Sequence, residues 1–261
     1  MRSNVAARHI GLARTLSKLG YCSRSHAADL IRAGRVSLNG KIHRDPETPV
    51  SGKREQIAID GKAIECQSKI YLMLNKPNGV VTTVSDEKGR ETVYTILNAD
   101  WANNALVAGE TLPWVGPVGR LDKASEGLLL VTNDSEWAAR ITAPETHLNK
   151  TYHVQVGAIV DEASIQALVE GVKTKEGEVL RAKQARRLRV GQKNCWLEII
   201  LDEGKNRQIR RMIETLGFEV LRLVRVAVGP LLLGDLAKGE FRALTAQEKK
   251  MLDRATQDKT S

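Results

Sequence analysis

The amino-acid sequence predicts an α+β fold, in which a small N-terminal α/β domain precedes a larger domain with a mixed, mostly antiparallel sheet. Two observations lead to this prediction. After residue 70, strand-like apolar runs alternate irregularly with helical segments, and their hairpin-like spacing favours an antiparallel over a doubly wound sheet. Before residue 67, Asn39-Gly40 and Asp60-Gly61 each separate two short runs that contain apolar residues, which is typical of β-hairpins.

The first domain is expected to span residues 12–66. A short helix around Leu16 ends at Gly20. Ser23 is a favourable N-cap for a second helix, which buries its apolar side chains and ends at Gly34. Together with the two hairpins, these helices make a complete small domain.

Positive charge is concentrated in this first domain. The chain has a net charge of +9, and residues 1–65 hold twelve Lys and Arg against six Asp and Glu. Such an excess favours a polyanionic partner. We expect Arg24, Arg32 and Arg35 to project from the helical side of this domain and contact phosphates, with a solvated surface as the alternative. A second cluster, within residues 181–189, is either RNA-facing or a solvated strand.

Composition argues against several other classes of protein. No apolar run reaches the ~18 residues of a membrane span, and no apolar core follows Arg2 and Arg8 to form a secretory signal. Cys22, Cys66 and Cys195 lie far apart without a Cys-x-x-Cys pair, which argues against a disulfide framework and a zinc site. We expect a cytoplasmic protein without a membrane partner, and we take it to be a monomer.

The larger domain is expected over residues 70–248, followed by a polar, flexible tail over residues 249–261. Examples of its predicted strands are residues 127–131, 152–156, 195–201 and 221–226, and its helices are predicted over 135–141, 162–169 and 208–216. The last helix carries an apolar stripe, and arginines occupy other positions on the same turns.

A loop carboxylate stands directly before an apolar strand of this domain. Asp122 lies between Gly119 and Gly127 and is flanked by Arg120 and Lys123. The cationic neighbours should keep this carboxylate ionised, which suits a nucleophile better than a proton donor. On spacing alone, however, a turn or capping role is the simpler interpretation.

Several ordered motifs resemble those of one enzyme family. They are Leu74-Asn-Lys-Pro-Asn-Gly-Val, Gly119-Arg-Leu-Asp, Glu126-Gly-Leu-Leu-Leu, Thr132-Asn-Asp, Lys150-Thr-Tyr and Glu203-Gly-Lys-Asn-Arg-Gln-Ile-Arg-Arg-Met. Together they resemble the bacterial pseudouridine synthases that modify ribosomal RNA. The first domain, through Leu16-Ser-Lys-Leu-Gly and Leu30-Ile-Arg-Ala-Gly-Arg-Val, resembles the small RNA-binding domain named after a ribosomal protein of the small subunit.

The resemblance implies roles for individual residues. Asp122 takes the place of the catalytic aspartate, and Tyr152 that of the tyrosine that packs against the target base; a half-buried strand tyrosine is the alternative. Arg210 best matches the basic partner that pairs with the aspartate, ahead of Arg207. Further substrate contacts implied by the resemblance are Arg120, Lys150 and Ile209. For Lys150 the alternative is a contact with a neighbouring carboxylate, and for Ile209 core packing is equally expected.

The implied reaction is the isomerisation of a uridine to pseudouridine, which needs no cofactor. The implied partner is ribosomal RNA or a pre-ribosomal particle, and Asn206-Arg-Gln-Ile favours the large subunit. The resemblance leaves open whether the aspartate attacks the base, attacks the sugar or deprotonates the sugar. The alternatives are a non-catalytic RNA-binding ribosome-assembly factor and a nuclease, although no metal-binding carboxylate cluster is evident for the latter.

Overall fold

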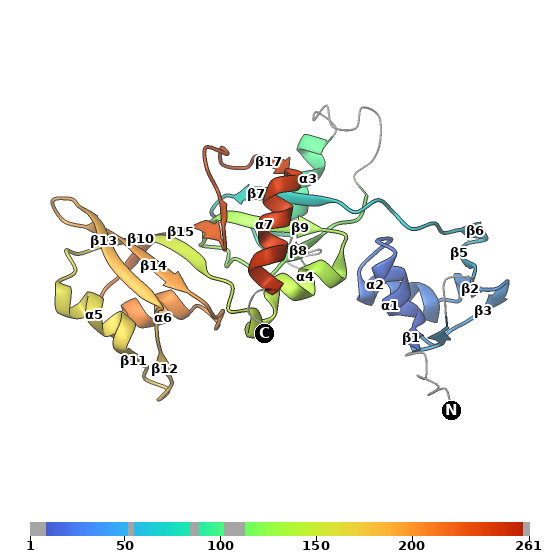
Figure 1. The fold of residues 1–261 in the computed structure, drawn as a ribbon, viewed down its shortest axis with the longest axis horizontal. Helices are drawn as coiled ribbons and strands as arrows, with labels where there is room; N and C mark the ends of the chain where they lie inside the picture. The colour runs from blue at the N-terminus through green and yellow to red at the C-terminus, as the bar shows by residue number, and fades with distance from the viewer. Residues whose placement is uncertain (1–8, 52–54, 84–88, 102–112, 258–261) are drawn as a thin grey trace. The chain divides into compact units, whose positions relative to one another are not determined.

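The computed structural model describes residues 9–51, 55–83, 89–101 and 113–257. The chain divides into two compact units (Figure 1). The first comprises Met1–Tyr71, Thr111–Gly116 and Thr132–Trp137, and the second comprises Leu72–Glu110, Pro117–Val131 and Ala138–Ser261. Because the first unit takes up short segments from beyond residue 110, the boundaries expected from the sequence, 12–66 and 70–248, stay predictions.

The N-terminal part of the first unit forms the elements that its sequence predicts. The Oγ of Ser23 accepts a hydrogen bond from the N–H of His26 at 3.1 Å and so caps α2. Asn39 and Asp60 have φ angles of 52° and 49°, and each precedes a glycine with positive φ, as type I′ hairpin turns require. The helices are α1 (Leu12–Lys18) and α2 (Arg24–Arg32), and the strands are β1 (Ile10–Gly11), β2 (Val36–Leu38), β3 (Lys41–Ile42), β4 (Pro49–Val50), β5 (Ile57–Ile59) and β6 (Lys62–Ala63).

A small apolar core holds this part together. Leu16, Ala27 and Ile31 of the helices pack with Val36 and Ile59 of the four-stranded sheet β3-β2-β5-β6, and all five are buried. The predicted helix stops at Gly20 and Gly34 are confirmed, because both glycines have positive φ just after the helices end.

A mixed sheet forms the centre of the second unit. Its strand order is β13-β14-β10-β15-β9-β7-β17, with β16 paired to β15 and β8 to β9. The β13–β14, β14–β10, β10–β15, β15–β16 and β7–β17 pairs are antiparallel, and β15 pairs in parallel with β9. The fold class predicted from the sequence is confirmed. The strands are β7 (Tyr71–Lys76), β8 (Gly116–Val118), β9 (Glu126–Thr132), β10 (Lys150–Val156), β13 (Gln184–Val190), β14 (Cys195–Leu201), β15 (Val220–Val228), β16 (Leu231–Leu232) and β17 (Phe241–Ala243).

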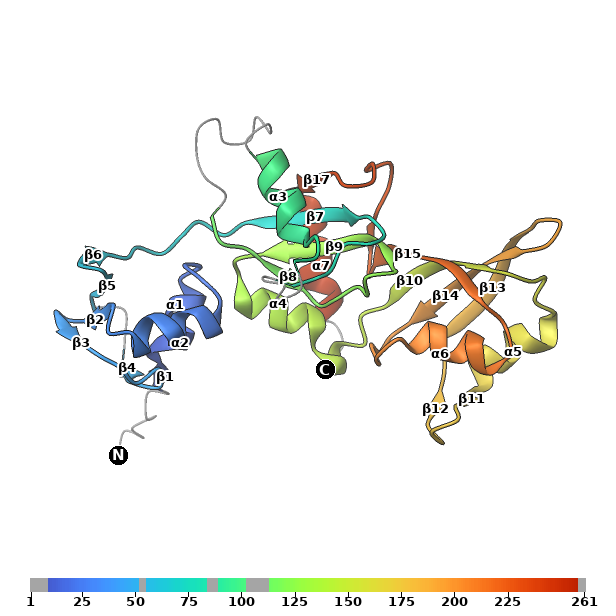
Figure 2. The same cartoon turned by 180° about the vertical axis from the view of Figure 1, so that it is seen from behind.

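Helices cover this sheet, and three of them lie where the sequence predicts them. Those three are α4 (Ser135–Thr142), α5 (Glu162–Glu170) and α6 (Gln208–Thr215); the others are α3 (Val93–Trp101), the 3-10 turn η1 (Pro144–Thr146) and α7 (Ala246–Gln257). In Figures 1 and 2, α5 and α6 lie on one side of the β13-β14-β10 part of the sheet, beside the short hairpin of β11 (Val172–Lys173) and β12 (Val179–Leu180). Leu168 and Met212 of these helices pack against Val154, Leu197 and Ile199 in one buried core.

The junction of β15 and β9 depends on a glycine. Gly127 pairs with Arg225, and its φ of +102° is one that L side chains rarely adopt. A Cβ atom at this position would lie 2.8 Å from the Arg225 nitrogen, inside van der Waals contact. Only glycine therefore lets these two strands approach, and this pairing places the end of the Asp122 loop against β15.

The flexible tail expected over residues 249–261 is wrong for residues 249–257, which belong to α7. Two features of the sequence build this helix. Thr245 and Glu248 form a capping box, in which Glu248 accepts from the Thr245 N–H at 2.8 Å and Thr245 Oγ1 accepts from the Glu248 N–H at 3.2 Å. Leu252 and Thr256 form a buried stripe on the polar helix. Residues 258–261 lie outside the described part of the chain.

We expect Glu248→Gln to lower the free energy of unfolding by about 1 kcal/mol at pH 7, because it weakens the cap and the two hydrogen bonds that Arg242 donates at 2.6 and 2.8 Å. The Arg242 hydrogen bond lowers the pKa of Glu248 to about 2. A depressed carboxyl pKa stabilises the fold above the unfolded value of about 4.3, and this stabilisation is lost as pH falls toward 2. Urea unfolding from pH 7 to pH 3 measures the difference, with exposed Asp235→Asn as control; a constant difference across this range would contradict the assignment.

Candidate active site

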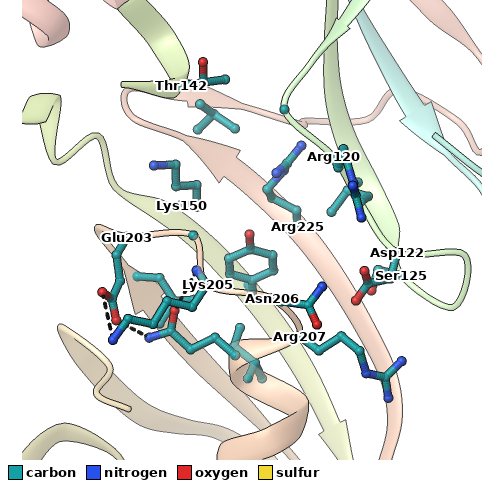
Figure 3. Close-up of a pocket in the computed structure, with 18 of the residues that line it drawn as sticks. Arg120, Asp122, Ser125, Thr142, Lys150, Glu203, Lys205, Asn206, Arg207 and Arg225 are labelled. Atoms are coloured by element: carbon teal, nitrogen blue, oxygen red, sulfur yellow. Dashed lines mark hydrogen bonds and ion pairs between the residues drawn. The ribbon is translucent and has the colours of Figure 1, made fainter. Parts of the chain in front are cut away.

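A cleft of about 540 Å³ opens in the second unit (Figure 3). Its walls come from the loop between β8 and β9, the starts of β10 and α6, the loop 202–207 and the middle of β15. The structure brings six of the residues predicted from the sequence to this one cleft: Arg120, Asp122, Lys150, Tyr152, Arg207 and Ile209.

Asp122 projects from a turn at the mouth of β9. Its backbone carbonyl accepts from the N–H of Ser125 at 3.0 Å, which closes the turn, and the residue is half-buried. Among the described residues, its carboxylate has no hydrogen bond or ion pair with another side chain. By contrast, the backbone carbonyls of residues 121–125 each accept a hydrogen bond. Figure 3 shows this carboxylate next to Ser125 of the same turn. A turn role and an accessible carboxylate therefore coexist at this position.

A buried lysine holds the far end of the Asp122 turn. Lys76, at the end of β7, has no exposed surface, and its Nζ donates to the carbonyls of Ser125 at 2.8 Å and of Pro77 at 2.9 Å. Burial lowers the pKa of Lys76 to about 8, while the charges of Glu126 and Asp122 oppose this shift. The motif Leu74-Asn-Lys-Pro includes this lysine, but its contact with the Asp122 turn could not be predicted from the motif.

The ion pair expected between Arg210 and Asp122 is not formed among the described residues. Arg210 is buried in α6, and its guanidinium donates to the carbonyl of Ala124 at 2.8 Å and to that of Val220 at 3.4 Å. Burial lowers the pKa of Arg210, and the nearby Asp122 charge opposes the shift without a direct contact. The reason is geometric: the side chain meets backbone carbonyls of the turn and of β15 before it reaches the carboxylate. Arg210 therefore stabilises the backbone of the Asp122 turn through its hydrogen bond to Ala124.

Tyr152 lies on the same side of β10 as the apolar core. It pairs with Ile199 and Arg225 of the neighbouring strands, packs partly against the buried core and also lines the cleft. Lys150 lines the cleft from two residues earlier on the same face of β10. Tyr152 is therefore a half-buried strand residue that also lines the cleft, and its packing against a target base stays a prediction.

The start of α6 contributes two predicted residues to the cleft. Arg207 is the N-cap of α6 with a φ of 47°, in the left-handed region that non-glycine residues seldom occupy. Ile209 is 3% exposed and packs into the core while its edge lines the cleft. Gln208 fixes the loop before this helix, because its Nε2 donates to Glu203 at 2.6 Å and to the Arg181 carbonyl at 2.9 Å.

Arg225 is a cleft residue to which the sequence assigned no role. It is 6% exposed, lines the cleft from β15 and donates its Nε to the Leu128 carbonyl of β9 at 2.7 Å. With Arg120, Lys150, Lys205 and Arg207 it gives the cleft five cationic side chains, against the three carboxylates of Asp122, Asp202 and Glu203. Such a lining suits an anionic ligand that carries phosphates.

The three arginines predicted on the first unit lie on its surface and each contacts a carboxylate. Arg24 pairs with Glu47 at 3.3 Å and Arg32 with Asp29 at 3.3 Å. Arg35 donates three hydrogen bonds to Asp60, which raise the pKa of Arg35 and lower that of Asp60. All three arginine side chains are more than half exposed. Their contact with phosphates stays a prediction.

Among the described residues, no group of three or more His, Cys, Asp or Glu side chains is placed to hold a metal ion. None of the helices described has the length and apolar character needed to cross a membrane.

Residues 70–215, more than half of the chain, match the family model described as RNA pseudouridylate synthase. This chain belongs to the RNA pseudouridylate synthase family. A second model, the S4 domain, matches residues 10–55. The resemblance inferred from the ordered motifs is confirmed, and this RNA pseudouridylate synthase is an isomerase that acts on RNA.

Relatives of this synthase cover nearly its full length. The chain is 35% identical over 243 residues to ribosomal large subunit pseudouridine synthase B of Bacillus subtilis (strain 168), covering 92% of this chain and 94% of that protein. It is 34% identical over 241 residues to an uncharacterized RNA pseudouridine synthase of Aquifex aeolicus (strain VF5), covering 92% of each. A crystal structure of a pseudouridylate synthase, 28% identical, superposes with a TM-score of 0.63 over 93% of this chain and 99% of that one.

The buried lysine of this synthase generates a prediction about pH. The fold lowers the pKa of Lys76. Between pH 8 and 10, the Lys76 side chain is therefore protonated in the unfolded chain but has released its proton in the folded chain. The stability of the native protein relative to Lys76→Met should therefore rise by ~1 kcal/mol or more as pH increases through this window. Urea unfolding at pH 7.5 and pH 10 measures this difference. The exposed Lys250→Met is the control, and a difference that is flat or falls with pH would contradict the prediction.

Proposed function

We propose that this synthase isomerises a specific uridine of large-subunit ribosomal RNA, with Asp122 as the catalytic carboxylate. One observation carries the proposal: a half-buried aspartate with no side-chain partner among the described residues faces a cleft lined by five cations and a tyrosine. The large-subunit substrate is supported by the name of the Bacillus subtilis relative and by the Asn206-Arg-Gln-Ile segment at the cleft.

The chemistry requires a base-sized pocket and a carboxylate. The bond between the ribose carbon 1′ and uracil nitrogen 1 breaks, and a bond from the same carbon to uracil carbon 5 forms; carbon 5 loses its proton and nitrogen 1 gains one. Asp122 serves this exchange by attack on the sugar, by attack on the base or by deprotonation of the sugar. Each route needs an ionised carboxylate beside the nucleoside, within reach of the sugar or of the base.

The other predicted cleft residues hold the uridine. A uridine must leave its stack before its glycosidic bond is accessible, and the ring of Tyr152 offers a face on which the extruded uracil stacks. Ile209 closes the apolar side of this pocket. Arg120, Lys150 and Arg207 are placed around the cleft and contact the phosphates on either side of the uridine.

Arg210 takes a positioning role in this proposal. Its hydrogen bond to the Ala124 carbonyl, together with that of Lys76 to the Ser125 carbonyl, fixes the turn that carries Asp122. Two cations then act on the backbone of the turn and leave the carboxylate accessible to substrate. This arrangement replaces the direct ion pair expected from the sequence.

The first unit adds RNA affinity outside the cleft. The S4 match covers α1, α2 and the strands β1 to β4, and Arg24, Arg32 and Arg35 stay exposed in this region. Contact of these arginines with ribosomal RNA or a pre-ribosomal particle, action as a monomer and a cytoplasmic location complete the proposal.

We expect Asp122→Asn to lower pseudouridine formation at least ~1,000-fold while RNA affinity changes less than about twofold, because the substitution removes a charge and keeps the size. Tritium release from uridine labelled at carbon 5, in a large-subunit ribosomal RNA transcript, measures the reaction. Asp235→Asn, on an exposed loop, is the matched control. Substantial residual activity of Asp122→Asn would remove Asp122 from the mechanism, and an inactive native protein that binds the transcript would favour the non-catalytic alternative.

A second expectation concerns the substrate. Mapping of pseudouridines in ribosomal RNA from cells that lack this protein should show the loss of one site in the large subunit and none in the small subunit. Complementation with the native gene should restore the site, and complementation with Asp122→Asn should not. Loss of a small-subunit site instead would refute the substrate and retain the enzyme.

A further inference from the structure

The sheet of the second unit has a second face that the cleft does not use. Side chains alternate across a strand, so β10, β13, β14 and β15 point one set toward α5, α6 and the cleft and another set away from them. In Figures 1 and 2, no described helix of the second unit lies over this part of the sheet on the side away from α5 and α6. We call this side the outer sheet face; its central residues are His153, Gln155, Arg186, Arg189, Trp196, Glu198, Arg222 and Val224.

One row of the outer sheet face carries two arginines on a tryptophan. Arg189, Trp196, Gln155 and Arg222 are successive partners across the four strands. The guanidinium of Arg189 lies 4.8 Å from the centre of the Trp196 ring, and that of Arg222 lies 5.6 Å from it. Because neighbouring strands lie about 4.8 Å apart, this row spans roughly 14 Å of sheet.

The cations of this face are exposed and the carboxylates are covered. Glu198 has an 18% exposed side chain and contacts Arg186, which is 66% exposed. Glu126, at the adjoining edge, is 3% exposed and contacts both Arg222 and Lys238, which are 41% and 57% exposed. A partner that approaches this face therefore meets positive charge.

The geometry of the arginines selects an oxyanion partner. A guanidinium that stacks on an indole keeps its N–H edge available, and that edge matches the oxygens of phosphate. Among the described residues, Arg189 has no carboxylate within ion-pair distance, so its charge is compensated there only by the ring. A purely structural cation–π pair needs one arginine, whereas this tryptophan holds two beside further exposed cations.

We propose that the outer sheet face is a second RNA contact surface, which binds backbone phosphates of a segment of the same RNA that lies outside the segment entering the cleft. The inference rests on the proposed function, in which the target uridine enters the cleft on the opposite side of the sheet. A short stem-loop in the cleft does not reach around the sheet, so the contact requires a longer RNA. The surface adds affinity without reading sequence.

The test compares Arg189→Gln and Arg189→Glu with the same changes at Arg254, an exposed arginine of α7. The probes are a full-length, unmodified large-subunit ribosomal RNA transcript and a stem-loop that carries the mapped uridine. We expect Arg189→Gln to weaken transcript binding about threefold and to reduce the slope of log affinity against log salt by ~0.7–0.9, and Arg189→Glu to weaken it about tenfold. Stem-loop binding and its isomerisation rate should stay unchanged.

Several results would overturn the proposal. The first is that Arg189→Glu binds both RNAs as tightly as the native protein does. The second is that Arg189→Glu weakens binding of the stem-loop as much as binding of the transcript. The third is that Arg254→Glu weakens transcript binding as much as Arg189→Glu does. Weaker binding to pre-ribosomal particles with unchanged binding to the naked transcript would assign the surface to a protein partner instead. Urea unfolding shows whether each variant folds as the native protein does. Asp122→Asn, which should lose isomerisation yet keep transcript binding, separates failure of this surface from failure of the proposed function.

Discussion

The site depends on two buried cations that hold backbone carbonyls of the Asp122 turn. Lys76 donates to Ser125 and Arg210 donates to Ala124, so the turn is fixed from β7 and from α6 at once. Burying two positive charges is costly, and carbonyl oxygens together with nearby carboxylates compensate this cost. If either cation paired directly with Asp122, the carboxylate would be neutralised and turned from the cleft. The backbone contacts instead fix the turn and leave its one acidic side chain accessible.

Strand order then brings the remaining residues to this turn. Tyr152 on β10 and Asp122 before β9 are separated by β15 alone, and the close pairing of Gly127 with Arg225 brings β9 against β15. Arg225 closes the arrangement, because its guanidinium crosses from β15 to the Leu128 carbonyl while the side chain lines the cleft. Residues that lie 30 or more positions apart in the chain thus share one pocket because of one parallel junction in a mostly antiparallel sheet.

Local patterns in the sequence were sufficient for the local structure. Ser23 as an N-cap, the two turn glycines after Asn39 and Asp60, and the apolar stripe of α6 each act within a few residues, so their chemistry determines their conformation. The α7 helix had an equally local signal in its Thr245–Glu248 capping box, but its polar composition obscured it. The hydrogen-bond acceptor of Arg210 could not be predicted in this way, because long-range packing determines whether a guanidinium meets a carboxylate or a backbone carbonyl. The motif identified the arginine, and only the fold identified its acceptor.

The alternation of one sheet explains how a small enzyme separates chemistry from RNA affinity. Tyr152 and His153 are neighbours in β10, yet one lines the cleft and the other contacts Glu198 on the outer sheet face. The neighbours Leu223 and Arg222 of β15 show the same alternation, because Leu223 packs in the buried core and Arg222 stacks on Trp196 of the outer sheet face. Charge added to the outer sheet face lies at the solvated surface, where water and salt screen its effect on Asp122. The low-dielectric side can be tuned for catalysis while the solvated side gathers the phosphates of a long RNA, where salt-dependent contacts act additively.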